Sequence, residues 1–169
     1  MPSFLQRLRP YLSTFLTVIV LIAAWRAVTL PRWAAGDVAR EGDWETARPG
    51  DCRLMAQAVL AYDKRHGRAT LPLLSQGAGP GPCDWPRAGL ALERVTQAQF
   101  AAATAGALHN TGYIPHRVLG RPRYSLFHLR ASVGVGRNRD WLDGGGDDCQ
   151  FWRTPFGWRL QQCREAWIS

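Results

Sequence analysis

The chain has 169 residues, of which 46% are hydrophobic and 20% are charged, and its formal net charge at pH 7 is +8. This hydrophobic content excludes an intrinsically disordered chain, and the length leaves room for one domain with a modest core beside any membrane segment. The positive charge rests on arginine, because Lys64 is the only lysine. Such a balance favours acidic partners, among them anionic lipids, acidic glycans and acidic proteins.

The N-terminal part of the chain predicts a membrane anchor. The run Tyr11–Trp25 carries no charge, and its fifteen residues would cover about 22 Å as a helix, against about 30 Å of bilayer hydrocarbon. Extending the helix to 11–30 reaches the usual length if the side chain of Arg26 snorkels to the headgroups. Pro10 and Pro31 are expected to bracket the segment, since neither suits a helix interior. We therefore predict a single membrane span.

Two alternatives to an uncleaved anchor remain. A cleaved signal peptide needs small residues at positions −3 and −1, but the candidate pairs Leu21/Ala23 and Ile22/Ala24 place a bulky residue at −3. A buried core helix would also show a long apolar run. The predicted layout is a short N-terminal tail at 1–10, a transmembrane signal-anchor at 11–30, a juxtamembrane linker at 31–50 and a folded domain at 51–169.

The first helix of the domain is predicted over 52–66. Asp51 suits its N-cap, apolar residues recur within it at helical spacing, and Gly67 suits the position just past its end. Several tryptophans fall outside predicted elements, where exposed aromatic side chains mark interfaces. These tryptophans are Trp33 and Trp44 in the linker and Trp85 and Trp141 in loops.

Farther along the chain, the sequence predicts a second helix followed by strands. Thr96 and Gln99 have the spacing of a capping box, which predicts a helix that ends near His109. The apolar period then changes to two and predicts strands over Tyr113–Leu119, at an edge because it contains a proline, and over Tyr124–Val135. This order predicts an α+β domain in which two helices pack on an antiparallel meander of three to five strands.

The four cysteines are predicted to form two disulfides. The segment Thr154–Trp158, with its proline and glycine, is typical of a hairpin turn with a G1 bulge. A three-residue loop pairs Thr154 with Trp158, and the same register places Cys149 opposite Cys163. Cys52 and Cys83 then pair by elimination. One face of the hairpin is expected to carry Trp152, Trp158 and Leu160 and to contribute to the core.

The cysteines also decide on which side of the membrane the domain is expected to lie. More arginines follow the apolar run than precede it, so the positive-inside rule alone favours a cytoplasmic domain. Disulfides persist outside the cytoplasm, and we predict a single-pass protein of the inner or plasma membrane with a periplasmic C-terminal domain. The alternatives are a cytoplasmic domain with four free thiols and a zinc site, which the lack of CxxC or close Cys–His spacing disfavours.

Arginines and aromatic residues concentrate on two neighbouring predicted strands and the loop that follows. They predict a basic, aromatic-lined surface for a protein partner in the cell envelope, for an acidic glycan or for anionic lipid headgroups. A nucleic-acid partner is not expected for a domain outside the cytoplasm. The residues of this predicted surface are Arg117, Arg121, Arg123, Arg130, Arg137, Arg139, Tyr113, Tyr124 and Trp141.

The sequence contains no complete catalytic, nucleotide-binding or metal-binding motif, and no cofactor is predicted. The loop Asp140–Asp148 groups four carboxylates around three glycines and is a candidate for calcium, although it lacks the EF-hand spacing. We predict a non-catalytic binding, accessory or assembly subunit of a cell-envelope complex. The alternative is a cell-envelope hydrolase, in which one histidine meets a carboxylate and a nucleophile in a deep pocket. The histidines are His66, His109, His116 and His128.

Overall fold

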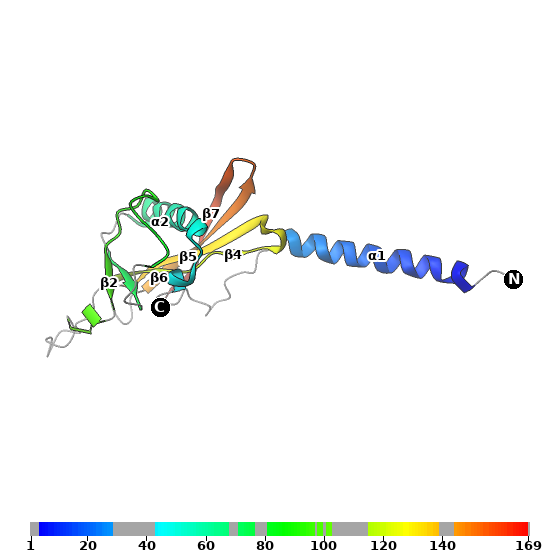
Figure 1. Ribbon diagram of the computed structural model, residues 1–169, viewed down its shortest axis with the longest axis horizontal. Coiled ribbons are helices and arrows are strands. Elements are labelled where there is room, and N and C mark those ends of the chain that lie inside the picture. Colours follow the sequence, from blue (N-terminus) through cyan, green and yellow to red (C-terminus); the bar gives the residue numbers. More distant parts are fainter. Residues whose placement is uncertain are drawn as a thin grey trace.

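The computed structural model describes residues 4–28, 43–67, 71–76, 81–96, 98–99, 101–102, 115–138 and 144–168. Within these ranges the chain forms an N-terminal helix, a second helix and a mixed sheet. The predicted α+β class is therefore confirmed. Figure 1 shows the second helix beside the sheet and the first helix extending away from both.

The N-terminal helix α1 spans Phe4–Val28. A helix in this region agrees with the prediction, but its expected start after Pro10 is wrong, because α1 continues through that proline; the ring removes one backbone hydrogen bond and the neighbouring ones remain. In the part of the chain that the structure describes, no helix is long and apolar enough to cross a membrane. The predicted transmembrane span at 11–30 is not supported by this finding.

Helix α2, Cys52–His66, packs on one face of the sheet. Its predicted bounds are confirmed, and Gly67, with a φ of +84°, ends it. Asp51 occupies the predicted N-cap position, but its carboxylate makes no capping hydrogen bond. This carboxylate accepts instead from the backbone N–H of Arg48 at 3.2 Å and from the hydroxyl of Tyr124. The buried side chains of α2 are Cys52, Leu54, Met55, Ala56, Ala58, Val59 and Tyr62.

Seven strands of the described chain form one sheet, in the order β2-β1-β3-β5-β6-β7, with β4 paired to β5. β1 runs parallel to β2 and β3, whereas the part from β3 to β7 is antiparallel. The predicted purely antiparallel meander is wrong at one end, because the long connections before β2 and β3 let the chain return in the same direction. The strands are β1 Leu73–Ser75, β2 Arg94–Thr96, β3 His116–Leu119, β4 Arg123–Tyr124, β5 Arg130–Asn138, β6 Gly144–Thr154 and β7 Gly157–Ile168.

Two predictions near β2 and β3 have different outcomes. β3 lies between β1 and β5 rather than at an edge, and Pro115 just precedes it, so it removes no ladder hydrogen bond. The predicted capping box is present: the N–H of Thr96 donates to the side chain of Gln99 at 2.8 Å, and the N–H of Gln99 donates to the hydroxyl of Thr96 at 3.3 Å. Residues 98–99 and 101–102 are helical, and the remainder of the predicted second helix lies outside the described residues.

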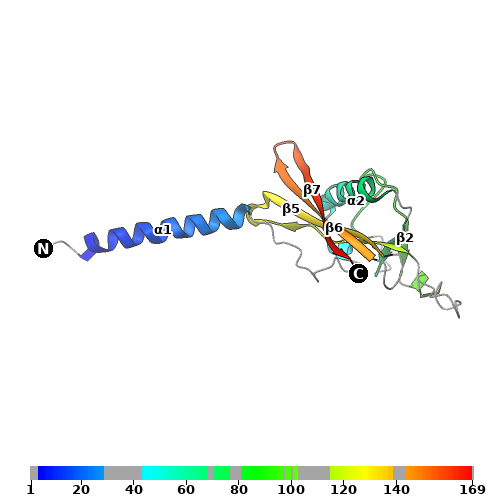
Figure 2. The same ribbon diagram turned by 180° about the vertical axis from the view of Figure 1, so that it is seen from behind.

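The β6–β7 hairpin differs from its predicted register at the tip. Thr154 pairs with Gly157 around a two-residue loop, and Gly157 has a φ of +115°. One extra residue in β7, Gln161, then shifts the register and brings Cys149 opposite Cys163. The predicted disulfide partner is therefore right, although the predicted loop is wrong. Figure 2 shows this hairpin projecting beyond the rest of the sheet.

The shifted register changes which side chains share a face of the hairpin. Trp152 pairs with Arg159 instead of Leu160, so it lies on the opposite face from Trp158 and Leu160. Trp158 packs against the core, whereas Trp152 is exposed on its own face. There the guanidinium carbon of Arg130 lies 3.7 Å from the centre of the Trp152 ring, a cation–π contact.

The core includes two tryptophans that the sequence predicts to be exposed. Trp44 lies in the 3₁₀ helix η1 (Asp43–Thr46) and is fully buried, and its indole N–H donates to the carbonyl of Leu74 at 3.0 Å. Trp85 is also buried, with its ring centre 5.6 Å from that of Trp44. The prediction fails because the loop that carries Trp85 folds back onto the start of α2. Trp33 and Trp141 lie outside the described residues.

Both predicted disulfides are present. Cys52 pairs with Cys83 and Cys149 pairs with Cys163, with Cα separations of 5.4 and 4.0 Å. The first fastens the loop of Trp85 to α2, and the second joins β6 to β7 beneath the same helix. The two bonds close loops of 31 and 14 residues. In the chain-entropy model each bond raises the free energy of unfolding by about 3–4 kcal/mol. The alternative of four free thiols does not describe this fold.

Candidate functional site

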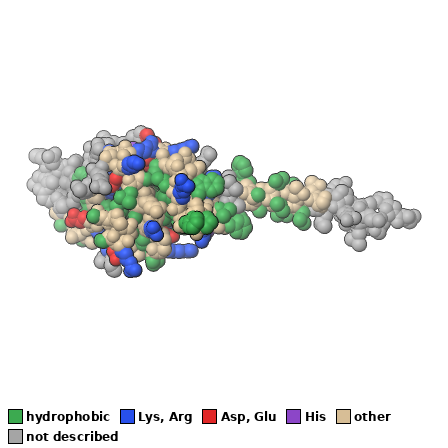
Figure 3. Space-filling view, turned by 90° about the horizontal axis from the view of Figure 1, so that it is seen from above, with side chains coloured by type: hydrophobic (Ala, Val, Ile, Leu, Met, Phe, Trp, Pro, Cys, Tyr) green, Lys and Arg blue, Asp and Glu red, His purple; other side chains and the backbone are tan. Residues whose placement is uncertain are grey.

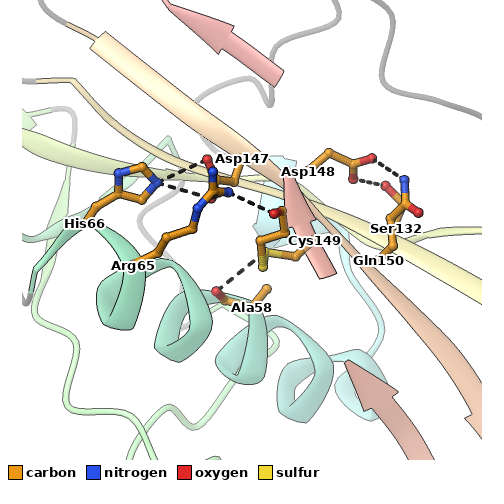
Figure 4. The surroundings of a disulfide bond; sticks show 9 residues. Ala58, Arg65, His66, Ser132, Asp147, Asp148, Cys149 and Gln150 are labelled. Carbon is orange, nitrogen blue, oxygen red and sulfur yellow. Dashed lines mark hydrogen bonds and ion pairs between the residues drawn. A yellow bond between two sulfur atoms is a disulfide. The ribbon is translucent and has the colours of Figure 1, made fainter. Parts of the chain in front are cut away.

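A polar cluster lies at the C-terminal end of α2. Asp147 of β6 is 1% exposed, and its carboxylate accepts from the guanidinium of Arg65 at 2.8 Å. The same carboxylate lies 3.2 Å from Nε2 of His66 (Figure 4). Arg65 also donates to the carbonyl of Cys163 at 2.8 Å. A buried carboxylate needs such partners, and here they connect α2 to both β6 and β7.

Two arginines on neighbouring strands join the same end of the helix. Nη1 of Arg117, on β3, lies 2.8 Å from Oδ1 of Asp63, and Arg117 is 2% exposed. This is an ion pair largely shielded from water, in which the removal of either partner would strand a charge. Arg137, on β5, donates to the carbonyl of His66 at 3.5 Å.

Tyr62 completes the cluster. Its hydroxyl donates to the carbonyl of Gly145 at 3.3 Å, and its ring centre lies 4.4 Å from that of His66. Burial raises the pKa of Tyr62, and the charge of Arg137 opposes this effect. The hydrolase alternative requires a nucleophile beside the histidine, but the contacts of the His66 ring are with Asp147 and Tyr62. The cluster connects the C-terminal end of α2 to β6 and β7.

Part of the predicted calcium loop is a strand. Residues 144–148 belong to β6, so the carboxylates of Asp147 and Asp148 lie on opposite faces of the sheet and cannot share one ion. Asp148 accepts from the hydroxyl of Ser132 and from the side chain of Gln150, the latter at 3.2 Å (Figure 4). The other two carboxylates of the loop lie outside the described residues. Among the residues that are described, no three His, Cys, Asp or Glu side chains are placed to hold a metal ion.

An open groove of about 570 Å³ lies between α2 and β7. Leu60 and Ala61 line it from the helix, and Trp158 and Leu160 line it from the strand. Leu60 is 42% exposed, although it is apolar and lies in the middle of a helix. The cationic side chains that line the groove are Lys64, Arg65 and Arg159.

The strand beside this groove is the last of the sheet. Within the described part of the chain, no strand pairs with the outer edge of β7, so its backbone donors and acceptors face outward there. The extra residues Gln161 and Ala166 interrupt the ladder, which leaves 157–160 and 162–165 as regular stretches. An apolar groove next to an open strand edge is suited to an extended peptide that adds to the sheet.

A second hollow, of about 470 Å³, lies beside the start of α2. Here the hydroxyl of Tyr124 donates to the carboxylate of Asp51, and its ring stacks on that of His128 with 4.6 Å between the centres. Burial, and after it the hydrogen bond to Asp51 and the charge of that carboxylate, raises the pKa of Tyr124 above its ordinary value of 10.0. Arg121 and Arg123 line the same hollow.

The predicted surface of arginines and aromatic residues is distributed over three places. Arg121, Arg123 and Tyr124 come together at the second hollow. Arg117 and Arg137 lie at the opposite end of α2. Arg130 lies over Trp152, on the face of the sheet away from α2. The remaining members, which lie outside the described residues, are Arg139, Tyr113 and Trp141.

The groove residues were not among the predicted site residues. One signal in the sequence points to them, because Leu60 falls outside the apolar stripe of its helix and an apolar residue there has no core to face. Leu160 gave no comparable signal, since its exposure depends on the bulge at Gln161. A pattern of alternating residues does not reveal a bulge.

Comparison of the chain with protein-family models, with curated proteins and with solved structures gives no significant match.

Proposed function

We propose that the chain is a non-catalytic, membrane-anchored subunit whose periplasmic domain binds a protein partner of the cell envelope. α1 is the anchor in this proposal, and the groove between α2 and β7 is the binding site. The observation that carries the proposal is the exposure of apolar side chains along α1, which extends away from the domain (Figure 1).

The large apolar side chains described in α1, from Phe15 to Trp25, are between 46% and 71% exposed. A helix that belongs to a folded core buries such side chains in a stripe, whereas a bilayer covers them all round. The uncharged run 11–25 covers about 22 Å along the axis, so the anchor needs the flanking parts of α1 to reach the roughly 30 Å of bilayer hydrocarbon. Arg26 lies near the end of the helix, where its side chain can reach the headgroups. The exposed apolar residues are Phe15, Leu16, Val18, Ile19, Val20, Leu21, Ile22 and Trp25.

The chemistry of the groove supports one kind of partner segment. Leu60 and Leu160 offer apolar contacts on its two sides, and its charged lining residues are all cationic. The open edge of β7 offers backbone hydrogen bonds to an extended chain. These features fit an extended segment of a partner protein that carries apolar side chains and carboxylates. Acidic partners also suit the formal net charge of +8.

The two disulfides support a periplasmic location. Disulfides form and persist in oxidising compartments and are rare in the cytosol. All four cysteines are engaged, and both bonds fix elements that border α2. In a reducing compartment the bonds would be broken, and the free energy of unfolding would fall by about 3 kcal/mol or more for each bond. This is a large part of the stability of a domain of this size.

The anchor is tested by one arginine placed at two depths of α1. Ile19→Arg puts a charge in the middle of the apolar segment, at a cost of about 2.5–3.5 kcal/mol for insertion, whereas Trp25→Arg puts the same charge near the interface, at a much smaller cost. We expect the full chain to stay in the membrane pellet after alkaline carbonate extraction. Ile19→Arg should release a larger fraction than Trp25→Arg. Release of the unmodified chain, or equal retention of the two variants, would argue against a membrane anchor.

The groove is tested by Leu60→Glu in the full chain. The exposed position should tolerate the change, and the new carboxylate would repel an acidic segment in the groove. We expect the complex formed by the chain in mild detergent to become smaller by native size analysis. The matched control is Phe156→Glu, at a fully exposed apolar residue outside the groove. An unchanged complex for Leu60→Glu, or an equal loss for both variants, would exclude the groove as the binding site.

A further inference from the structure

The turn between β4 and β5 exposes apolar side chains. The chain passes through the 3₁₀ helix η3 (Leu126–His128), and Leu126 is 48%, Phe127 71% and Leu129 44% exposed. The predicted continuous strand over Tyr124–Val135 would, by alternation, place Phe127 and Leu129 on the same face as the valines at 133 and 135, which are buried. The structure breaks the strand at this turn, and the apolar side chains point outward instead. We call Leu126, Phe127 and Leu129 the apolar turn.

The backbone of this turn is strained. Phe127 and His128 have φ values of +61° and +53°, in the left-handed region, which costs a residue with a Cβ atom about 1 kcal/mol or more. Hydrogen bonds hold the conformation: the N–H groups of His128 and Arg130 donate to the carbonyl and hydroxyl of Ser125, each at 2.9 Å. The exposed ring of Phe127 recovers little of that cost by packing within the domain. A rigid turn that presents apolar side chains to the outside indicates a contact surface.

The position of the apolar turn identifies what it contacts. η3 contacts α1, and Figures 1 and 2 show, from opposite sides, that α1 meets the domain at this turn. Figure 3 shows hydrophobic side chains both along α1 and at this end of the domain. Exposed arginines stand close by: Arg26 belongs to the last turns of α1, and the N–H of Arg153 donates to the carbonyl of Leu129 at 2.9 Å.

We propose that the apolar turn inserts into the lipid surface beside the point where α1 leaves the membrane. This inference rests on the proposed membrane anchor. Phenylalanine and leucine side chains partition into the boundary between headgroups and acyl chains, and nearby arginines meet lipid phosphates. Two contacts with the bilayer, α1 and the apolar turn, restrict the tilt of the domain and keep the groove between α2 and β7 in one orientation to the membrane.

Site-specific photo-crosslinking of the full chain tests this inference. p-Benzoylphenylalanine replaces Phe127 in one variant and Leu60 in a matched control, which is also an exposed apolar position but lies in the groove. Both variants are reconstituted in vesicles of phosphatidylcholine and phosphatidylglycerol, irradiated and analysed by mass spectrometry. We expect a protein–lipid adduct at position 127 and none above background at position 60. The non-reduced masses report whether both disulfides, and with them the fold, are intact.

The outcomes separate the inference from the proposal on which it rests. If the chain remains in the vesicles after a carbonate wash but position 127 forms no lipid adduct, the apolar turn does not contact lipid and the anchor still stands. Equal adducts at positions 127 and 60 would also overturn the inference, because lipid contact would then not be specific to the turn. If the carbonate wash removes the chain, the anchor and the inference both fail.

Discussion

Tyr124 and Asp51 connect two elements that lie far apart in the sequence. The tyrosine belongs to β4, the carboxylate directly precedes α2, and the hydroxyl donates its hydrogen bond to that carboxylate. The N–H of Arg48 donates to the other carboxylate oxygen at 3.2 Å. Asp51 therefore acts as a bridge between the start of α2 and the sheet, which is a different role from the predicted helix cap.

The raised pKa of Tyr124 predicts a loss of stability in alkaline solution. The tyrosine of the unfolded chain loses its proton near the ordinary value of 10.0, while the folded protein holds the proton to higher pH. The free energy of unfolding should therefore not change with Tyr124 ionisation below about pH 10 and should fall as the pH rises above it. Chemical unfolding of the full chain in detergent, followed at several alkaline pH values, measures this slope.

Tyr124→Phe should reduce that alkaline slope. At neutral pH the free energy of unfolding of the variant should be lower by about 1–2 kcal/mol, because the hydrogen bond to the carboxylate is missing. Tyr62→Phe is the comparison variant and should reduce the slope by less, because the pKa of Tyr62 is raised mainly by burial and its hydroxyl donates to the neutral carbonyl of Gly145. An alkaline slope in Tyr124→Phe equal to that of the unmodified chain would show that this tyrosine does not ionise at a raised pKa.

Gly81 is required by the buried ring of Trp44. A Cβ atom at Gly81 would lie 2.7 Å from Cζ3 of that ring, and Gly81 has a φ of +72°. Gly89 has a similar φ of +87° but no atom within 4 Å of such a Cβ. In both alanine variants the free energy of unfolding should fall by about 1–2 kcal/mol, because alanine disfavours this backbone conformation. In Gly81→Ala it should fall by about 1–3 kcal/mol more, because the new Cβ atom clashes with the ring. Equal unfolding midpoints in urea would show that the ring of Trp44 moves aside.

At the level of elements, α2 and the β6–β7 hairpin were the most predictable parts. The apolar stripe of 52–66 and the terminal Gly67 define α2 by local signals alone. The hairpin pairs Cys149 with Cys163 as predicted, but by a two-residue loop and a bulge instead of a three-residue loop. Both routes give the same cysteine register, so the cysteines alone could not distinguish them. The parallel pairing of β1 with β2 was not predictable, because each strand has only three residues.

Deletion of Gln161 tests the bulge. The two-residue loop would then place the two cysteines opposite each other without an extra residue, so the disulfide between Cys149 and Cys163 should still form. Insertion of one alanine after Gln161 adds a second extra residue and should lower the yield of that disulfide. Mass spectrometry of non-reduced peptides measures the yield of this disulfide in the deletion variant and in the insertion variant. Free thiols at these cysteines in the deletion variant would contradict the observed register.

The candidate site was less predictable than the fold, for a physical reason. The arginines of the predicted surface are close in sequence, but successive residues of a strand point to opposite faces and a turn separates β4 from β5. Arg117 is buried because Asp63, on α2, neutralises it. Such a partner cannot be identified without the packing of the helix on the sheet. The burial of Trp44 depends on packing in the same way.

At the level of the whole molecule, exposed apolar side chains of the described residues form three groups, apart from Trp152 and Phe156 of the β6–β7 hairpin. The three groups lie in α1, the apolar turn beside it and the groove between α2 and β7. In the proposed arrangement, the bilayer covers the first two and a partner protein covers the third. The groove borders the ion pairs at the end of α2, because Arg65 lines it and is paired with Asp147. The polar cluster around Asp147 joins α2 to β6 and β7 beside the groove.

The location of the domain outside the cytoplasm is tested most directly by counting thiols. Cells that contain the full chain are treated with a membrane-permeant alkylating reagent before lysis, and the protein is then reduced and treated with a second reagent of different mass. The proposed location predicts that all four cysteines carry the second reagent, because both disulfides exist in the cell. Four cysteines that carry the first reagent would place the domain in a reducing compartment and contradict the account.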